Sequence, residues 1–157
     1  MATINSKSLA RIAAIQAMYQ LSTPDNTNNL SKIKSQILDY YKSSNIYEDL
    51  DIEDSSTKIK VNHTLFNNLI DTTLANVDHI DRVIRENLDK EASFENLPEN
   101  SKAILRLGAT ELIFMPDIPS VVVVSEYTNI ASSMLKESEI GLVNSVLDSM
   151  KDSRKKE

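Results

Sequence analysis

Two cations followed by an aromatic residue stand out near the beginning of the chain. Lys7 and Arg11 are about one helical turn apart, and Tyr19 follows about two turns beyond Arg11. On one helix face, these side chains offer positive charge to phosphates and a ring on which a base of a single strand can stack. The alternative is an ordinary solvated helix face with Tyr19 half buried, because such faces are common in globular proteins.

Residue types that carry catalysis or bind metals are scarce. The chain has no cysteine and only two histidines, His63 and His79, and neither stands in a familiar metal-binding arrangement. No serine occupies a nucleophile elbow, and no glycine-rich loop is present to cradle phosphates. We therefore expect neither an enzyme nor a protein with a metal or another cofactor.

The composition is that of one globular domain built from helices. A chain of 157 residues with two glycines and four prolines has few tight turns and long uninterrupted elements. The net charge of −6 argues against a protein that grips nucleic acid across its whole surface, although it allows a local basic face. No window approaches the ~20 apolar residues of a membrane span, and the first residues do not resemble a signal peptide. Together with the missing cysteines, this predicts a cytoplasmic protein without membrane contact.

Apolar residues recur with the helical period along most of the chain, which predicts about seven helices. The expected helices cover residues 6–21, 30–41, 65–74, 77–88, the segment between Pro98 and Pro116, 127–135 and 143–150. Asp78 and Ser125 suit N-cap positions, and Gly141 is expected to interrupt the chain before the last helix. Val121 to Val124 are expected to form an extended or first-turn approach to the sixth helix, because β-branched residues favour strands.

The expected fifth helix is apolar almost all round, so it should be central. Its polar exceptions, Lys102, Arg106 and Thr110, form one narrow stripe at four-residue spacing. A charge in such a stripe must reach solvent, pair with a carboxylate or meet a ligand. For Arg106 we expect an ion pair with Glu111 or Glu126, whereas Lys102, nearer the helix start, is the better candidate for a ligand contact.

Two segments differ from the helical remainder. Residues 45–57 combine serines with an acidic cluster and have little periodicity, which predicts a flexible acidic loop. Residues 152–157 form a charged tail. The sequence therefore predicts one domain over residues 1–151, followed by this tail.

Three segments of the sequence are similar to the NusB family. The first is RIAAIQAMYQL at residues 11–21, which resembles the opening helix of the family. The second is KAILRLGATEL at residues 102–112, which resembles its central leucine-arginine helix. The third and most specific is IPSVVVVSEYTNIASSM at residues 118–134, followed by LVNSVLDSM at 142–150. The order and spacing of the three agree across nearly the whole chain.

The resemblance implies an all-α fold of two small helical bundles in a compact single domain. It also implies an adaptor that binds the boxA element of nascent, single-stranded RNA together with the small-subunit ribosomal protein NusE. This adaptor would act in the RNA polymerase antitermination complex during transcription of ribosomal RNA operons. A homodimer of the free chain is compatible with the sequence.

The same resemblance selects the candidate binding residues. The RNA-binding candidates are Lys7, Arg11, Gln16, Tyr19 and Lys102. Gln16 lies inside the matched opening motif, where its amide can bond a base edge or simply face solvent. Glu126 and Asn129, on the polar side of the sixth helix, are candidates for the contact with the ribosomal protein, with solvent exposure as the alternative.

The sequence departs from the family pattern mainly in its cations. Members often open with a cluster of arginines, whereas only Lys7 and Arg11 stand here, and Thr110 and Ser145 replace a usual tyrosine and glycine. A protein-interaction module with little RNA binding of its own is therefore the second hypothesis. Similar domains also precede certain ribosomal RNA cytosine methyltransferases, but we do not expect that activity because those enzymes require a long nucleotide-cofactor domain.

Overall fold

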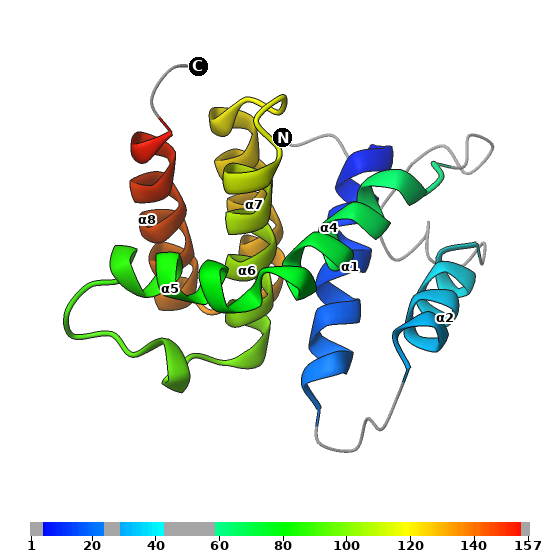
Figure 1. Cartoon of the computed structure of the whole chain (residues 1–157), viewed down its shortest axis with the longest axis horizontal. Helices are drawn as coiled ribbons and strands as arrows, with labels where there is room; N and C mark the ends of the chain where they lie inside the picture. Colours follow the sequence, from blue (N-terminus) through cyan, green and yellow to red (C-terminus); the bar gives the residue numbers. More distant parts are fainter. Residues whose placement is uncertain (1–4, 24–28, 43–58, 155–157) are drawn as a thin grey trace. The chain divides into compact units, whose positions relative to one another are not determined.

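The computed structural model describes residues 5–23, 29–42 and 59–154, and every regular element in these ranges is helical (Figure 1). The elements are α1 (Ser6–Ser22), α2 (Leu30–Lys42), α4 (His63–Ala75), α5 (Val77–Asn87), the 3-10 turn η1 (Phe94–Asn96), α6 (Glu99–Phe114), α7 (Ser120–Met134) and α8 (Glu137–Ser153). The expected all-α class and all seven expected α-helices are confirmed. No helix in the described ranges has both the length and the apolar character needed to cross a bilayer.

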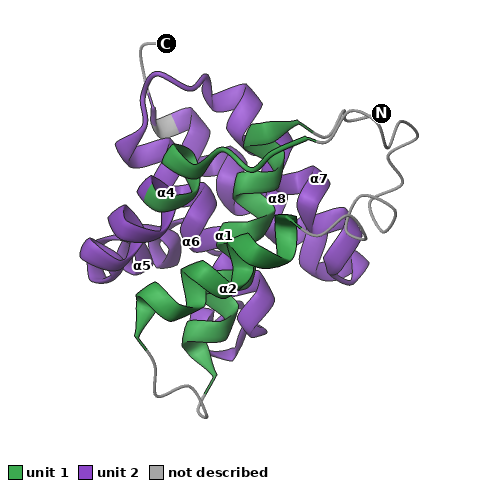
Figure 2. Ribbon diagram, turned by 90° about the vertical axis from the view of Figure 1, so that its right-hand side faces the viewer, with its two compact units in different colours: residues 1–67 green, residues 68–157 purple. Residues whose placement is uncertain are grey.

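The chain divides into two compact units, residues 1–67 and 68–157, which have separate colours in Figure 2. In the first unit, α1 packs against α2. The buried residues of α2 are Ile33, Ile37 and Tyr41, which recur every four residues and therefore form one stripe on the helix. Asn5 caps α1 in the preferred way, because its side-chain oxygen accepts a hydrogen bond from the Ser8 amide at 2.9 Å.

Helix α6 is the centre of the second unit. It contacts α5, α7 and α8, and ten of its sixteen residues are buried. Gly108 allows α8 to approach closely, since a Cβ atom at this position would lie 3.0 Å from both terminal carbons of Leu147. The nearly continuous apolar surface that the sequence predicted for this helix is thus covered by its neighbours.

Arg154 closes the C-terminal end of α6. Its guanidinium donates hydrogen bonds to the carbonyls of Glu111, Leu112 and Met115 at 2.9, 2.9 and 3.2 Å, and to that of Ile118 at 2.6 Å. The last carbonyls of a helix have no partner within the helix, and a cation suits the negative end of the helix dipole. A residue of the expected charged tail therefore has a structural role.

The valine run is helical, so of the two expected forms the first turn of the sixth helix is confirmed and the extended approach is wrong. Helix α7 begins at Ser120, directly after Pro119. Val123 and Val124 are buried, whereas Val121 is 66% exposed. Burial of one side of the first turns outweighs the strand preference of β-branched residues.

Two expected N-caps and one expected helix break are also wrong. Ser125 lies inside α7 and caps nothing, and the N-cap of α5 is Asn76, with Asp78 in its first turn. Helix α8 begins before Gly141, at Glu137, where the Lys136 amide donates to the Glu139 carboxylate at 3.2 Å. Gly141 is exposed and has open space around it, so the helix continues through it at a modest cost.

Parts of two further expectations lie outside the described residues. The acidic loop expected at 45–57 falls within the interval 43–58, which the structure does not describe. The last three residues of the expected tail, 155–157, are likewise outside it. The tail begins later than expected, because α8 continues to Ser153.

We expect Arg154→Met to lower the free energy of unfolding by about 1–3 kcal/mol, because partly buried carbonyls at the end of α6 lose their donors. Chemical denaturation followed by far-UV circular dichroism measures this loss. Arg82→Met is the matched control, since Arg82 is exposed and 3.8 Å from Glu86, and it should change stability by less than about 0.5 kcal/mol. Equal losses in the two variants would contradict the capping role.

Candidate nucleic-acid interface

Helix α1 presents an exposed cation and an exposed aromatic ring. Lys7 is exposed in its first turn, and Tyr19, near its C-terminal end, is 42% exposed. Tyr19 is twelve positions after Lys7, which corresponds to about 18 Å along the helix axis. Both side chains are accessible in the way that phosphate contact and base stacking require.

Arg11 does not share this exposed surface. Only 2% of Arg11 is exposed, and the residue has an interaction partner within the chain. The spacing of four residues places Arg11 near Lys7 on the helix, but contacts of the folded chain decide which side chains of a face reach solvent. The structure therefore separates the two cations that the sequence grouped together.

Gln16 links α1 to α2 in the first unit. Its Oε1 atom accepts a hydrogen bond from the Tyr41 hydroxyl at 2.9 Å, and Gln16 itself is half-buried. Burial raises the pKa of the Tyr41 hydroxyl well above its ordinary value of 10.0, the nearby Tyr40 raises it further, and the bond to Gln16 lowers it. The carbonyl end of the Gln16 amide is thus engaged inside the protein.

In the second unit, three cations surround one aromatic ring. The side chains of Arg85, Lys102 and Arg106 lie 5.2, 5.7 and 5.3 Å from the centre of the Phe94 ring. Phe94 begins the short turn η1 and is buried. The face of an aromatic ring attracts cations, so Phe94 holds three positive charges close together. We call these four residues the Phe94 cluster.

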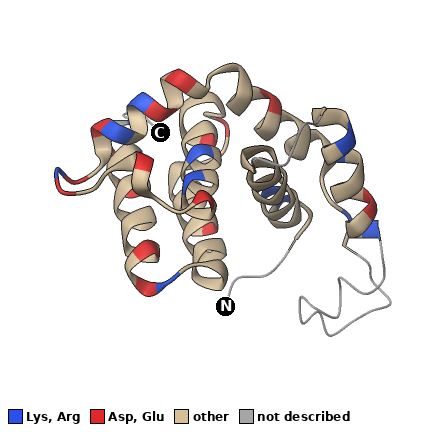
Figure 3. Ribbon diagram, turned by 90° about the horizontal axis from the view of Figure 1, so that it is seen from below, with Lys and Arg blue, Asp and Glu red and all other residues tan. Residues whose placement is uncertain are grey.

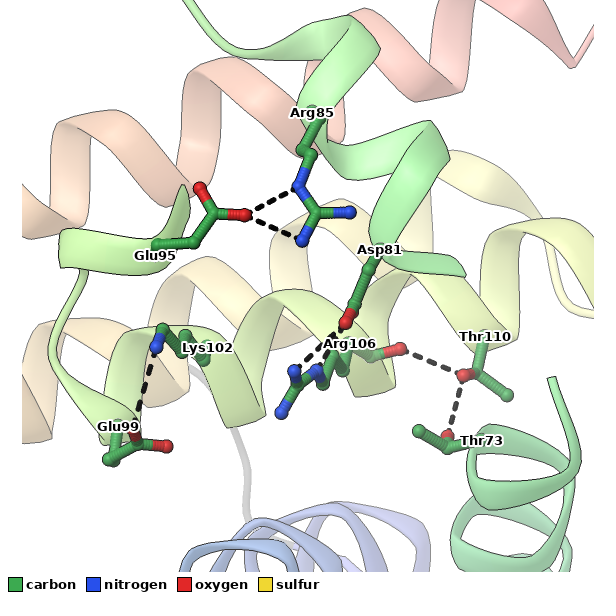
Figure 4. A network of polar contacts seen from close by, with 8 residues as sticks. All are labelled: Thr73, Asp81, Arg85, Glu95, Glu99, Lys102, Arg106 and Thr110. Carbon is green, nitrogen blue, oxygen red and sulfur yellow. Dashed lines mark hydrogen bonds and ion pairs between the residues drawn. The ribbon is translucent and has the colours of Figure 1, made fainter. Parts of the chain in front are cut away.

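Each cation of the Phe94 cluster has its own carboxylate (Figure 4). Arg106 binds Asp81 through two parallel hydrogen bonds of 2.8 and 2.9 Å. Arg85 donates to Glu95 at 2.6 and 2.8 Å. Lys102 Nζ lies 3.5 Å from Glu99 Oε1, a longer and weaker contact. The three positive charges of the cluster are therefore matched by three carboxylates around it.

The carboxylate of Glu95 has a lowered pKa. The largest cause is the hydrogen bond from its own backbone amide, and the hydrogen bond from Arg85 is the second. Glu95 is exposed, so this shift does not indicate a large stabilisation.

The ion pair expected for Arg106 is confirmed, but its partner is neither Glu111 nor Glu126. Glu111 instead accepts a hydrogen bond from the Tyr127 hydroxyl at 2.7 Å, in the buried interior of the second unit. Asp81, the actual partner, stands on α5, 25 residues before Arg106. Helical spacing indicates neighbours on one helix only, so no pattern in the sequence points to this pair.

The two candidate residues for the protein partner lie on α7. Asn129 is exposed, whereas Glu126 is half-buried and has an interaction partner within the chain.

Neither histidine lies in a metal-binding arrangement. His63 is exposed, and His79 lies against the Arg82 guanidinium at 2.8 Å and the edge of Phe114. Among the described residues, no group of three or more potential ligands could hold a metal ion.

The predicted RNA-binding residues belong to both units. Lys7, Arg11, Gln16 and Tyr19 lie in the first unit, and Lys102 lies in the second. Figure 3 shows basic and acidic residues interspersed along the described helices. Sequence reasoning missed Phe94, Asp81 and Arg85, of which Phe94 lies between two expected helices where no periodicity points to it.

A comparison with protein families finds a match to the NusB family over residues 8–152. A relative named transcription antitermination protein NusB from Rickettsia bellii is 40% identical over 153 residues, which cover 98% of this chain and 94% of the relative. A protein of the same name from Rickettsia massiliae is 39% identical over 145 residues, covering 92% of this chain and 90% of the relative.

Solved structures have the same fold. T. maritima NusB superimposes with a TM-score of 0.70 at 25% identity, covering 95% of this chain and 93% of that chain. A structure of the antitermination factors NusB and NusE in complex with dsRNA matches with a TM-score of 0.69 at 20% identity, covering 93% of this chain and 96% of the matched chain.

We expect Asp81→Asn to lower the free energy of unfolding by about 2 kcal/mol, because the partly buried Arg106 loses its charged partner. Urea denaturation of the whole chain measures the loss. Glu99→Gln, which removes the weaker contact of Lys102, should change the same quantity by no more than about 0.5 kcal/mol. Similar losses in the two variants would show that the Arg106 pair is not the stronger one.

The raised pKa of Tyr41 predicts a loss of stability in alkaline solution. The unfolded hydroxyl ionises near its ordinary value of 10.0, whereas the folded one still holds its proton there. The unfolded state then binds fewer protons, so stability falls as the pH rises above about 10. We expect Tyr41→Phe to make this fall shallower in urea titrations between about pH 9 and pH 11, and an unchanged slope would contradict it.

Proposed function

Because the chain belongs to the NusB family of transcription antitermination proteins, we propose that it is an adaptor that binds boxA-type RNA together with the ribosomal protein NusE. The observation that carries this proposal is the family match over residues 8–152, in a chain whose α1 exposes Lys7 and Tyr19. Single-stranded RNA is the ligand that suits such a surface best, since its bases are free to stack and to form hydrogen bonds.

The charge of the chain supports a mode in which contact with RNA is local. With a net charge of −6, the protein as a whole repels a polyanion. Lys7 is exposed near the positive end of α1, where a phosphate is also favoured by the helix dipole. RNA binding through a few such groups is weak, so a second protein that completes the surface increases both affinity and selectivity.

NusE is the proposed second protein, because a solved relative binds NusE and dsRNA in one complex. On this chain, we assign its contact to the polar side of α7, which carries Glu126 and Asn129. The adaptor would then act in the cytoplasm, within the RNA polymerase antitermination complex on ribosomal RNA operons.

A protein-interaction module with little RNA binding of its own is the second candidate. Two features favour it: Arg11 is buried, and Lys102 already lies beside a carboxylate. In that case NusE would supply most of the contact with RNA. The two candidates differ in whether substitutions on α1 change the affinity for RNA.

Fluorescence anisotropy of a labelled boxA-type RNA, at two salt concentrations and with or without NusE, tests the proposal. We expect this RNA to bind in preference to a scrambled strand and to a duplex, and NusE to tighten the binding. Lys7→Ala should reduce the slope of log affinity against log salt by about 0.7. Binding to NusE without any preference for boxA-type RNA, even in the complex, would favour the second candidate.

Tyr19→Ala should weaken binding about 5- to 150-fold if a base stacks on the ring. Tyr40→Ala is the matched control, because Tyr40 is 50% exposed in the same unit but lies on α2. Losses of the same size in both variants would argue against a specific site at Tyr19.

A further inference from the structure

We infer that Glu99 competes with an RNA phosphate for the ammonium group of Lys102, so that this carboxylate sets how strongly the second unit takes part in binding. The inference rests on the proposed RNA-binding function. It concerns two residues in the first turn of α6, three positions apart on the helix.

The distances single out Lys102 among the three cations of the Phe94 cluster. Arg106 is fixed by two short hydrogen bonds to Asp81, and Arg85 by a hydrogen bond of 2.8 Å and an ion-pair contact of 2.6 Å to Glu95. The 3.5 Å between Lys102 Nζ and Glu99 is the longest of these contacts and lies at the limit for a hydrogen bond. Lys102 is therefore the cation whose partner an incoming phosphate can most easily replace.

Phe94 keeps the ammonium of Lys102 in place without neutralising it. The ring centre is 5.7 Å from Nζ, and only 15% of the Lys102 side chain is exposed. A lysine in solvent loses rotamer freedom when it binds an anion. Here the stem is already largely covered, so less of that freedom remains to be lost when a phosphate binds.

Glu99 is more accessible than the lysine that it contacts. Its side chain is 44% exposed, so its carboxylate can turn into solvent when another anion takes its place. Until then it offsets the positive charge of Lys102. Surface ion pairs shift an equilibrium by no more than about fivefold, which a phosphate contact can overcome.

The test is a double-mutant cycle on the full chain with labelled boxA-type RNA and NusE. Glu99→Gln should tighten binding about two- to fivefold, the range of an exposed ion pair, and steepen the salt slope by up to about 0.7. Lys102→Met removes the charge but keeps an apolar stem over Phe94, and it should weaken binding. In the Lys102→Met background, Glu99→Gln should have no further effect.

Glu91→Gln controls for the change in net charge, because Glu91 is also exposed in the second unit. The inference is overturned if Glu99→Gln tightens RNA binding equally with and without Lys102, or if Glu91→Gln tightens it as much. Either result would mean that removing any negative charge lowers the general repulsion between the protein and RNA. No tightening would overturn the inference as well. If the wild-type chain binds boxA-type RNA and Tyr19→Ala weakens it, only this inference fails, whereas absence of RNA binding by the wild type removes the proposed function too.

Discussion

Helix α6 is surrounded by its neighbours in the second unit, so several of its buried polar groups depend on partners from other elements, although Ser101 Oγ is buried without a hydrogen-bond partner among the described residues. Thr110 bonds the Thr73 hydroxyl at 2.6 Å and the carbonyl of Arg106 at 2.8 Å. Glu111 accepts the Tyr127 hydroxyl, and the carbonyls at the C-terminal end accept Arg154. An unpaired buried polar group is costly, so these contacts restrict how Thr73 of α4, helix α7 and the chain after α8 can pack in the second unit.

The same constraint links the fold of the second unit to its surface chemistry. Arg106 needs Asp81, which holds α5 against α6, and the turn η1 inserts Phe94 beside the same guanidinium. Lys102, one turn before Arg106, then lies 5.7 Å from the centre of the same Phe94 ring. A residue proposed to bind RNA is thus positioned by residues whose first role is to satisfy a partly buried charge.

The helices could be predicted from the sequence because burial on one side leaves a period of apolar residues, as in Ile33, Ile37 and Tyr41 of α2. The pairs between helices could not be predicted. Asp81 and Arg106 stand on different helices, and spacing along one helix does not indicate contacts with another. Periodicity also predicted that Arg11 lies beside Lys7 on one exposed face. Exposure depends on the contacts of the folded chain, and in the structure Arg11 is buried. The valine run shows the same limit, because its strand preference left an extended form open and the packing of Val123 in the folded chain favours the helical first turn.

The distribution of charge determines what kind of RNA binding this chain can support. A polyanion approaches a protein of net charge −6 favourably only where a cation is accessible and weakly compensated. The arginines of the Phe94 cluster do not meet that condition, because short contacts to Asp81 and Glu95 engage them. Lys7 is exposed, and Lys102, although largely covered, has within the described part of the chain only one ion pair, of 3.5 Å, beside its contact with the Phe94 ring. With so few phosphate contacts, affinity must come largely from bases and from a partner protein, which favours selective over general RNA binding.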